Sequence, residues 1–114
     1  MSLKENRPWG TFEVLYTDNQ CKIKRIIVNP GQQLSLQYHT KREEHWYVIE
    51  GAGLVTCGDA SWGLTTGMST NIPRMTPHQI SNFGDTKLVF IEIQTGDYFG
   101  EDDIVRIKDI YNRI

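Results

Sequence analysis

Clusters of turn-forming residues recur at short, fairly even intervals along this chain and divide it into short pieces. The pieces between them are rich in β-branched and aromatic residues, as in 22–28, 45–50, 54–57 and 87–94. Many short runs of this kind, separated by glycine and proline, are typical of all-β sandwiches and barrels. The turn clusters lie at 18–19, 29–31, 51–53, 58–59, 66–67, 72–73, 76–77 and 84–85.

The run 87–94 shows the period of a strand most clearly. Leu88, Phe90 and Glu92 fall on one face of a strand, and the aliphatic residues between them fall on the other. A chain of 114 residues is long enough for one domain with a core and too short for two. The sequence therefore predicts a single all-β domain over residues 1–114.

The C-terminal segment has a different pattern. Acidic residues at 101–103 precede apolar residues at 104, 107 and 111, and Lys108 and Arg113 follow later in the segment. Acids in the first turn and bases near the end suit the dipole of a helix. We expect a short amphipathic helix over about 101–112, packed on the outside of the barrel.

Composition and charge exclude several classes of partner. The net charge of −2 gives no general attraction to nucleic acid or anionic membrane, and no apolar run approaches a membrane span. The N-terminus lacks the apolar stretch of a signal peptide. We therefore expect a cytoplasmic protein with Cys21 and Cys57 reduced, although their spacing alone leaves one disulfide open.

The spacing of four polar residues predicts a site for one divalent metal. Gln37 and His39 are two residues apart, so on a strand their side chains point to the same face. Glu44 follows after a short segment in which the chain can turn, and His78 begins another predicted strand. Two imidazoles, one carboxylate and one amide oxygen suit Zn, Mn, Fe, Co or Ni, and leave a position for water or substrate.

These four residues lie in two blocks of regular spacing. The blocks are Gly31-x5-Gln37-x-His39-x4-Glu44-x6-Gly51 and Gly67-x5-Pro73-x4-His78-x3-Asn82. They resemble the two motifs of the cupin superfamily, and the resemblance implies a small jelly-roll β-barrel. Gln37 departs from the pattern, since most cupins have a first histidine there, and Met75 replaces the glycine of the second block.

Further strings in the chain narrow this resemblance. They are Arg7-Pro8-Trp9-Gly10, Leu34-Ser35-Leu36-Gln37, Arg42-x-Glu44-His45-Trp46, Ile72-Pro73, Pro77-His78 and Gly100-Glu101-Asp102-Asp103-Ile104-Val105-Arg106. Together they are similar to the C-terminal domain of bifunctional type II phosphomannose isomerase/mannose-1-phosphate guanylyltransferases, over about residues 7–113. This resemblance implies a metal-dependent isomerase of carbohydrate metabolism that interconverts mannose 6-phosphate and fructose 6-phosphate through an enediol. Zinc is the expected metal, with Mn, Co, Fe and Ni as alternatives.

Two other functions fit the same residues. One is a non-catalytic, metal-containing cupin that binds a sugar or a sugar phosphate without converting it. The other is an Fe- or Ni-dependent oxygenase. Gln37 counts against the oxygenase, because the usual oxygenase metal shell is rich in histidine.

Arg42 and His45 are the candidate catalytic residues. Arg42 lies two residues before Glu44, so it shares that face of the strand and could stabilise an enediolate or bind phosphate. His45 has a suitable intrinsic pKa for a general base, but on a regular strand it points opposite to Glu44 and could equally be structural. Glu92 is another possible base, or an ion-pair partner of Lys24 or Arg25.

Ser35, Lys24 and Arg106 are the candidate substrate-binding residues, as donors for a phosphate group. The tryptophans 9, 46 and 62 are expected to close the barrel or to form a subunit contact. Small barrels have strand edges to protect, and pairing them across two subunits is one solution. We therefore expect a homodimer that binds a small sugar phosphate.

Overall fold

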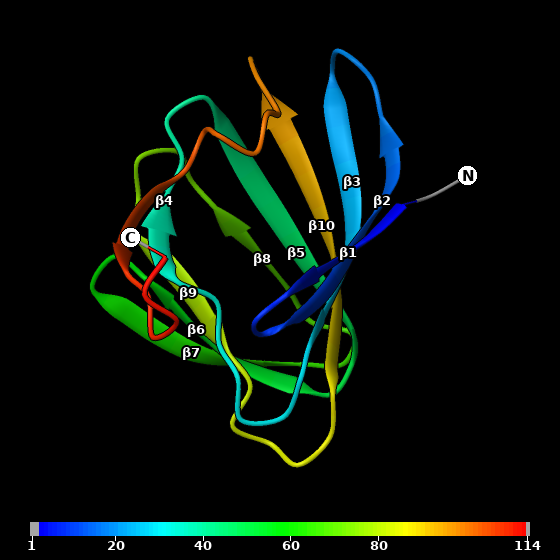
Figure 1. The fold of residues 1–114 in the computed structure, drawn as a ribbon, viewed down its shortest axis with the longest axis vertical. Coiled ribbons are helices and arrows are strands. Elements are labelled where there is room, and N and C mark those ends of the chain that lie inside the picture. The colour runs from blue at the N-terminus through cyan, green and yellow to red at the C-terminus, as the bar shows by residue number, and fades with distance from the viewer. Residues whose placement is uncertain (1–2, 114) are drawn as a thin grey trace.

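The chain folds into two antiparallel β-sheets that face each other (Figure 1). The computed structural model describes residues 3–113, and residues 1, 2 and 114 lie outside the described part. The strands are β1 (Leu3–Arg7), β2 (Gly10–Thr17), β3 (Cys21–Val28), β4 (Leu36–Tyr38), β5 (Arg42–Glu50), β6 (Ala52–Cys57), β7 (Ala60–Thr65), β8 (Ser69–Ile72), β9 (His78–Ser81), β10 (Leu88–Gly96) and β11 (Val105–Lys108).

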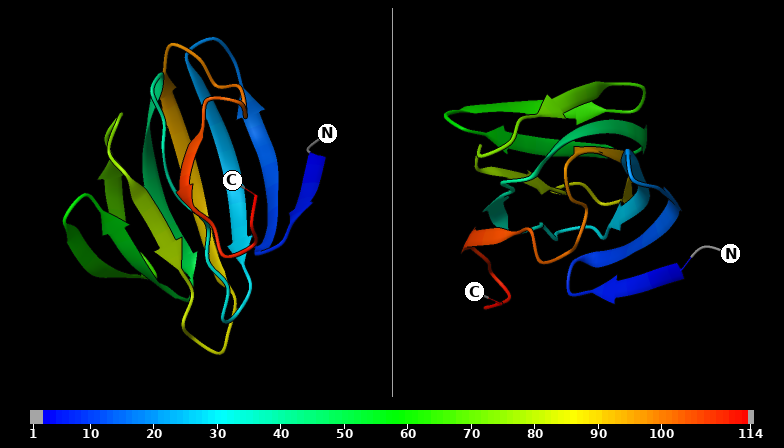
Figure 2. Two further views of the ribbon diagram at one scale, coloured as in Figure 1. Left: turned by 60° about the vertical axis from the view of Figure 1, so that its left-hand side comes forward. Right: turned by 90° about the horizontal axis from the view of Figure 1, so that it is seen from above.

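The larger sheet has six strands in the order β1-β2-β3-β10-β5-β8, and the smaller has five in the order β11-β4-β9-β6-β7. Apolar residues from both sheets meet between them and form the core, in which Trp46 and Phe90 pack with ring centroids 5.3 Å apart. Seen from above, β1 and β11 lie on the same side of the barrel (Figure 2). The predicted all-β barrel is confirmed.

Strand β10 shows how the sequence places polar groups inside this barrel. Leu88, Phe90 and Glu92 are buried, whereas Ile91 and Ile93 are half-buried on the opposite face, as the alternation predicts. The inward face thus changes along one strand from apolar side chains to a carboxylate. The polar end of that face borders the candidate site described below.

The predicted C-terminal helix does not form, and this expectation is wrong. The segment instead contains β11, which pairs antiparallel with β4 at the edge of the smaller sheet. Val105 and Ile107 are β-branched and favour a strand, and β4 without β11 would leave an unpaired edge. The Asp103 carboxylate also accepts hydrogen bonds from the Thr40 and Lys41 amides, at 3.1 and 2.9 Å, which holds the segment extended beside β4. Tertiary pairing therefore overrides the helical pattern.

Two smaller features bear on the sequence predictions. Met75, at the position of the cupin glycine, has a φ of 63°, so the turn keeps the left-handed conformation that glycine adopts without strain. Its amide donates to the His39 carbonyl at 2.8 Å, which ties this turn to the end of β4. Cys21 and Cys57 are both free thiols. Within residues 3–113 no helix is long and apolar enough to cross a membrane.

Candidate metal centre

Three buried side chains converge between the two sheets. His39 follows β4, Glu44 lies on β5 and His78 begins β9, and their ligand atoms all lie within 4.8 Å of one another. Burial of two imidazoles and a carboxylate at one point requires compensation by hydrogen bonds, a proton or a metal. The structure thus brings together three of the four residues predicted to bind a metal, and their role as ligands stays a prediction.

Hydrogen bonds to backbone carbonyls fix the orientation of both imidazoles. His39 Nδ1 donates to the Asp103 carbonyl at 2.6 Å, and His78 Nδ1 donates to the Thr76 carbonyl at 2.9 Å. A carbonyl oxygen only accepts, so each Nδ1 carries a hydrogen, and in the neutral ring Nε2 then presents its lone pair. This is the second-sphere arrangement that orients histidine ligands for metals.

The free lone pairs show that a cation fits the cluster. His78 Nε2 is buried and has no hydrogen-bond partner among residues 3–113. His39 Nε2 lies 3.1 Å from Glu44 Oε2, a distance at which two acceptors need a proton or a metal ion between them. Without a metal, burial lowers the pKa of His39, but the hydrogen bond and charge of Glu44 outweigh burial and raise it. The donor set therefore suits a divalent metal.

Gln37 lies next to this cluster on the neighbouring strand. It pairs with His78 across β4 and β9, and its Oε1 accepts a hydrogen bond from Ser35 Oγ at 3.3 Å. Residues that pair across antiparallel strands have side chains on the same face, so Gln37 and His78 face the same space. Its role as the fourth ligand stays a prediction.

Arg42 contacts two of the three candidate ligands. Its Nε donates to Glu44 Oε2 at 3.0 Å, and its Nη2 lies 3.4 Å from His39 Nε2. Burial raises the pKa of Glu44, but the hydrogen bond and charge of His39, with Arg42, hold it well below its usual value. The carboxylate is therefore ionised and ready to bind a cation.

A second carboxyl group, Glu92, lies beside the first. Trp46 Nε1 donates to Glu44 Oε1 at 3.0 Å and to Glu92 Oε1 at 3.2 Å. Burial, followed by the charge of Glu44, raises the pKa of Glu92 to about 7. Lys24 does not pair with Glu92 as one alternative supposed, because its Nζ binds both oxygens of Glu101, at 2.9 and 2.8 Å.

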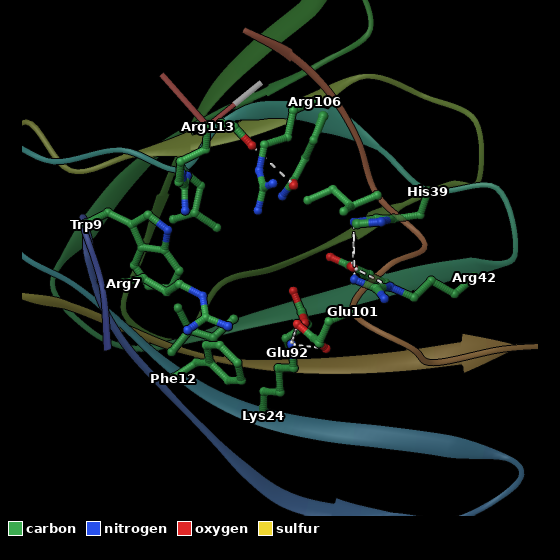
Figure 3. A pocket seen from close by; sticks show the side chains of 16 residues that line it. Arg7, Trp9, Phe12, Lys24, His39, Arg42, Glu92, Glu101, Arg106 and Arg113 are labelled. Atoms are coloured by element: carbon green, nitrogen blue, oxygen red, sulfur yellow. Dashed lines mark hydrogen bonds and ion pairs between the residues drawn. The ribbon is translucent and has the colours of Figure 1, made fainter. Parts of the chain in front are cut away.

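A cavity of about 110 Å³ opens beside the cluster. It brings together every predicted substrate residue, namely Ser35, Lys24 and Arg106, and also Arg42 (Figure 3). His45 does not reach it. That histidine points to the outer face of β5, where its Nδ1 lies 2.5 Å from Asn71 Oδ1, on the side opposite to Glu44.

The sequence reasoning missed several residues of this cavity. Arg7, Arg113 and Glu101 also line it, and Asp103 orients His39 through its carbonyl. Arg7, Glu101 and Asp103 lie within the strings that carry the family resemblance, which was a usable signal. Glu101 and Asp103 fell within the predicted helix and Arg113 directly after it, and that error concealed their positions.

Asp103 supports the site from outside it, and its replacement by alanine is predicted to cost about 2–4 kcal/mol of stability. Its carboxylate accepts three hydrogen bonds, from the Thr40 amide, the Thr40 hydroxyl at 2.8 Å and the Lys41 amide. Urea denaturation of the metal-free protein measures the change. Asp102→Ala is the matched control, since Asp102 is exposed and, among residues 3–113, its side chain accepts a hydrogen bond only from the Tyr98 hydroxyl, at 2.5 Å. An equal effect of both substitutions would contradict the prediction.

Two facing antiparallel sheets that enclose a His/Glu/His cluster define this protein as a cupin. Within that class the chain belongs to the family described as mannose-6-phosphate isomerase C-terminal, which it matches over residues 1–109. The chain is 45% identical over 107 residues to the alginate biosynthesis protein AlgA of Pseudomonas aeruginosa, covering 94% of this chain and 22% of that protein. It is 44% identical over 107 residues to a mannose-1-phosphate guanylyltransferase of Klebsiella pneumoniae, covering 94% and 23%.

Among solved structures, the capsular polysaccharide assembling protein CapF of Staphylococcus aureus shares this fold. The TM-score is 0.84 at 20% identity, over 96% of this chain and 33% of that one. Similarity at this level of identity concerns the fold alone.

These comparisons overturn one prediction. The chain was expected to act by itself as a mannose-6-phosphate/fructose-6-phosphate isomerase. The relatives that it matches are instead larger proteins named for alginate biosynthesis and for guanylyl transfer, and the chain spans between a fifth and a quarter of their length. It corresponds to their isomerase-like C-terminal domain, and this match gives no support to isomerisation by that domain alone.

Proposed function

We propose that this chain is a divalent-metal-binding domain that binds a phosphorylated sugar in its cavity. The observation that carries the proposal is the excess of positive charge beside the candidate metal centre. Three carboxylates line the cavity, and one of them, Glu92, has a pKa of about 7, so it is partly neutral near neutral pH. Five basic side chains line it, namely Arg7, Lys24, Arg42, Arg106 and Arg113.

His39, Glu44 and His78 would hold the metal, with Gln37 as a fourth ligand. Zinc is the first candidate, because nitrogen and oxygen donors in this number suit it, and Mn, Co, Fe and Ni accept the same donors. When bound, the metal would polarise sugar oxygens as a Lewis acid. Arg42 would bind the anionic part of the ligand next to it by its planar fork of donors.

The names of the relatives indicate which sugar phosphates to try first. One relative is a mannose-1-phosphate guanylyltransferase, and the family is described by mannose 6-phosphate. Mannose 6-phosphate and mannose 1-phosphate are therefore the proposed ligands. The homodimer expected from the sequence stays a prediction.

Titration calorimetry tests this function with zinc-loaded protein. Mannose 6-phosphate is expected to bind with a Kd in the micromolar to low millimolar range, and unphosphorylated mannose at least about 10-fold more weakly, since each charge-assisted hydrogen bond contributes about 1.5–3 kcal/mol. Removal of the metal by a chelator is expected to weaken binding further. Equal affinity for mannose and both phosphates, or no binding at all, would overturn the proposal.

A further inference from the structure

Three arginines from distant parts of the sequence meet at one side of the cavity. Arg7 ends β1, Arg106 lies on β11 and Arg113 lies in the segment after it, and all three line the cavity. Figure 3 shows them opposite His39 and Arg42. Burial lowers the pKa of Arg106, the charge of Arg113 lowers it further, Asp109 raises it, and Arg7 lowers it again, so Arg106 interacts electrostatically with both other arginines and with the carboxylate that pairs with Arg113.

The carboxylates nearby do not balance this group. Arg113 is paired with Asp109 by two contacts, at 2.6 and 3.1 Å, and Arg7 has a solvent-exposed contact to Glu5 at 3.3 Å. Arg106 forms no ion pair with any carboxylate in the described part of the chain. Its Nε is moreover buried without a hydrogen-bond partner. Arg106 is half-buried as a residue, and a buried donor atom left without a partner is costly unless an anion completes it.

The register of the smaller sheet fixes where that anion would lie relative to the metal centre. Arg106 pairs with Gln37 across β11 and β4, and Gln37 pairs with His78 across β4 and β9. The three residues therefore form one rung whose side chains share a face. Because neighbouring strands are about 4.8 Å apart, the backbone of Arg106 lies about 10 Å from that of His78. One small ligand can contact both ends of such a rung.

We propose that Arg106, flanked by Arg7 and Arg113, binds the phosphoryl group of the ligand, with the sugar directed along the rung toward His39, Glu44 and His78. This inference rests on the proposed function and adds the position and the orientation of the ligand. The phosphate dianion supplies the acceptors that Arg106 lacks, and it relieves the repulsion among three guanidinium groups. A planar guanidinium binds two phosphate oxygens at once, which an ammonium cannot do.

The test compares Arg106→Gln with Lys108→Gln in zinc-loaded protein. Lys108 lies on the same strand and is exposed and outside the cavity, so its loss removes equal charge without removing the site. Arg106→Gln is expected to weaken mannose 6-phosphate binding about 10- to 100-fold, whereas Lys108→Gln changes it less than about 3-fold. Arg106→Lys is expected to recover only part of the loss, and Arg7→Gln and Arg113→Gln to give smaller losses.

Two further readouts separate this inference from the proposed function. Zinc content and the melting temperature of Arg106→Gln are expected to match the wild type, and inorganic phosphate is expected to compete with mannose 6-phosphate in the wild type only. If the wild-type protein binds no sugar phosphate, the proposed function fails. If it does bind one and folded Arg106→Gln binds it as tightly, or if that variant loses mannose and mannose 6-phosphate equally, the placement of the phosphoryl group is wrong.

Discussion

His78→Ala is expected to lower the zinc affinity of the protein by more than about 100-fold, since loss even of an outer-sphere partner costs about 10- to 100-fold. His78 is 1% exposed, and its Nε2 has no hydrogen-bond partner in the described part of the chain. Its ligand atom lies within 4.8 Å of those of His39 and Glu44. Removal of this ligand leaves only His39 and Glu44 of the three clustered donors, and two protein donors hold a divalent metal weakly. Competition titration against a chromophoric chelator measures the affinity. Gln37→Ala is expected to give a smaller loss in the same direction.

The chain provides its own control for the histidine substitution. His45 is the third histidine of the sequence, and it lies on the outer face of β5 with Asn71 as its partner. His45→Ala is therefore expected to leave zinc affinity unchanged. Thermal unfolding of both metal-free variants checks that the barrel still forms, because His78 also packs against Trp46, with ring centroids 5.7 Å apart. Full zinc affinity in a folded His78→Ala protein would refute the ligand assignment.

Glu92→Gln is expected to stabilise the metal-free protein in mild alkali. An ordinary glutamate has a pKa near 4.5, and burial together with the charge of Glu44 raises that of Glu92 to about 7. A raised folded pKa gives stability that is complete in acid and is lost as the pH rises through about 7. The neutral amide avoids this loss, so the variant is expected to gain about 2–3 kcal/mol at about pH 8 and little at about pH 4.5.

Urea denaturation of metal-free protein at several pH values measures this difference. The amide nitrogen of the variant can donate to Glu44 as the acid proton of Glu92 does, while its amide oxygen still accepts from Gln94. It cannot accept from Trp46 Nε1, which keeps its other hydrogen bond, to Glu44 Oε1 at 3.0 Å. Glu50→Gln serves as the control, because Glu50 is exposed at the end of β5 and does not line the cavity. A gain that is equal at both ends of the pH range would show that Glu92 does not titrate between them.

Local sequence patterns predicted the barrel because its strands have strong local signals. The alternation in β10 is visible in the sequence, and the inward position of Glu92 follows from it. The spacing within the two ligand blocks likewise predicted that His39, Glu44 and His78 lie at one site, and their ligand atoms do lie close together. In these segments the local preference of each residue agrees with its tertiary environment.

The tail could not be predicted in this way because its conformation depends on a distant partner. The pattern of 101–112 suits a helix in isolation, but β4 offers an edge to pair with, and Asp103 binds the turn that follows β4. The guanidinium cluster was missed for the same reason. Arg113 and Arg7 lie far apart in the sequence and meet only when both ends of the chain pack beside the cavity.

The segment from Asp103 to Arg106 has a consequence for how two ligands would influence each other. At one end its carbonyl holds His39 in the orientation that a metal requires, and three residues later it carries the arginine proposed for phosphate. Any ligand that fixes this segment in place also prepares the site of the other. Metal and sugar phosphate are then thermodynamically coupled, and by reciprocity each raises the affinity of the other by the same factor.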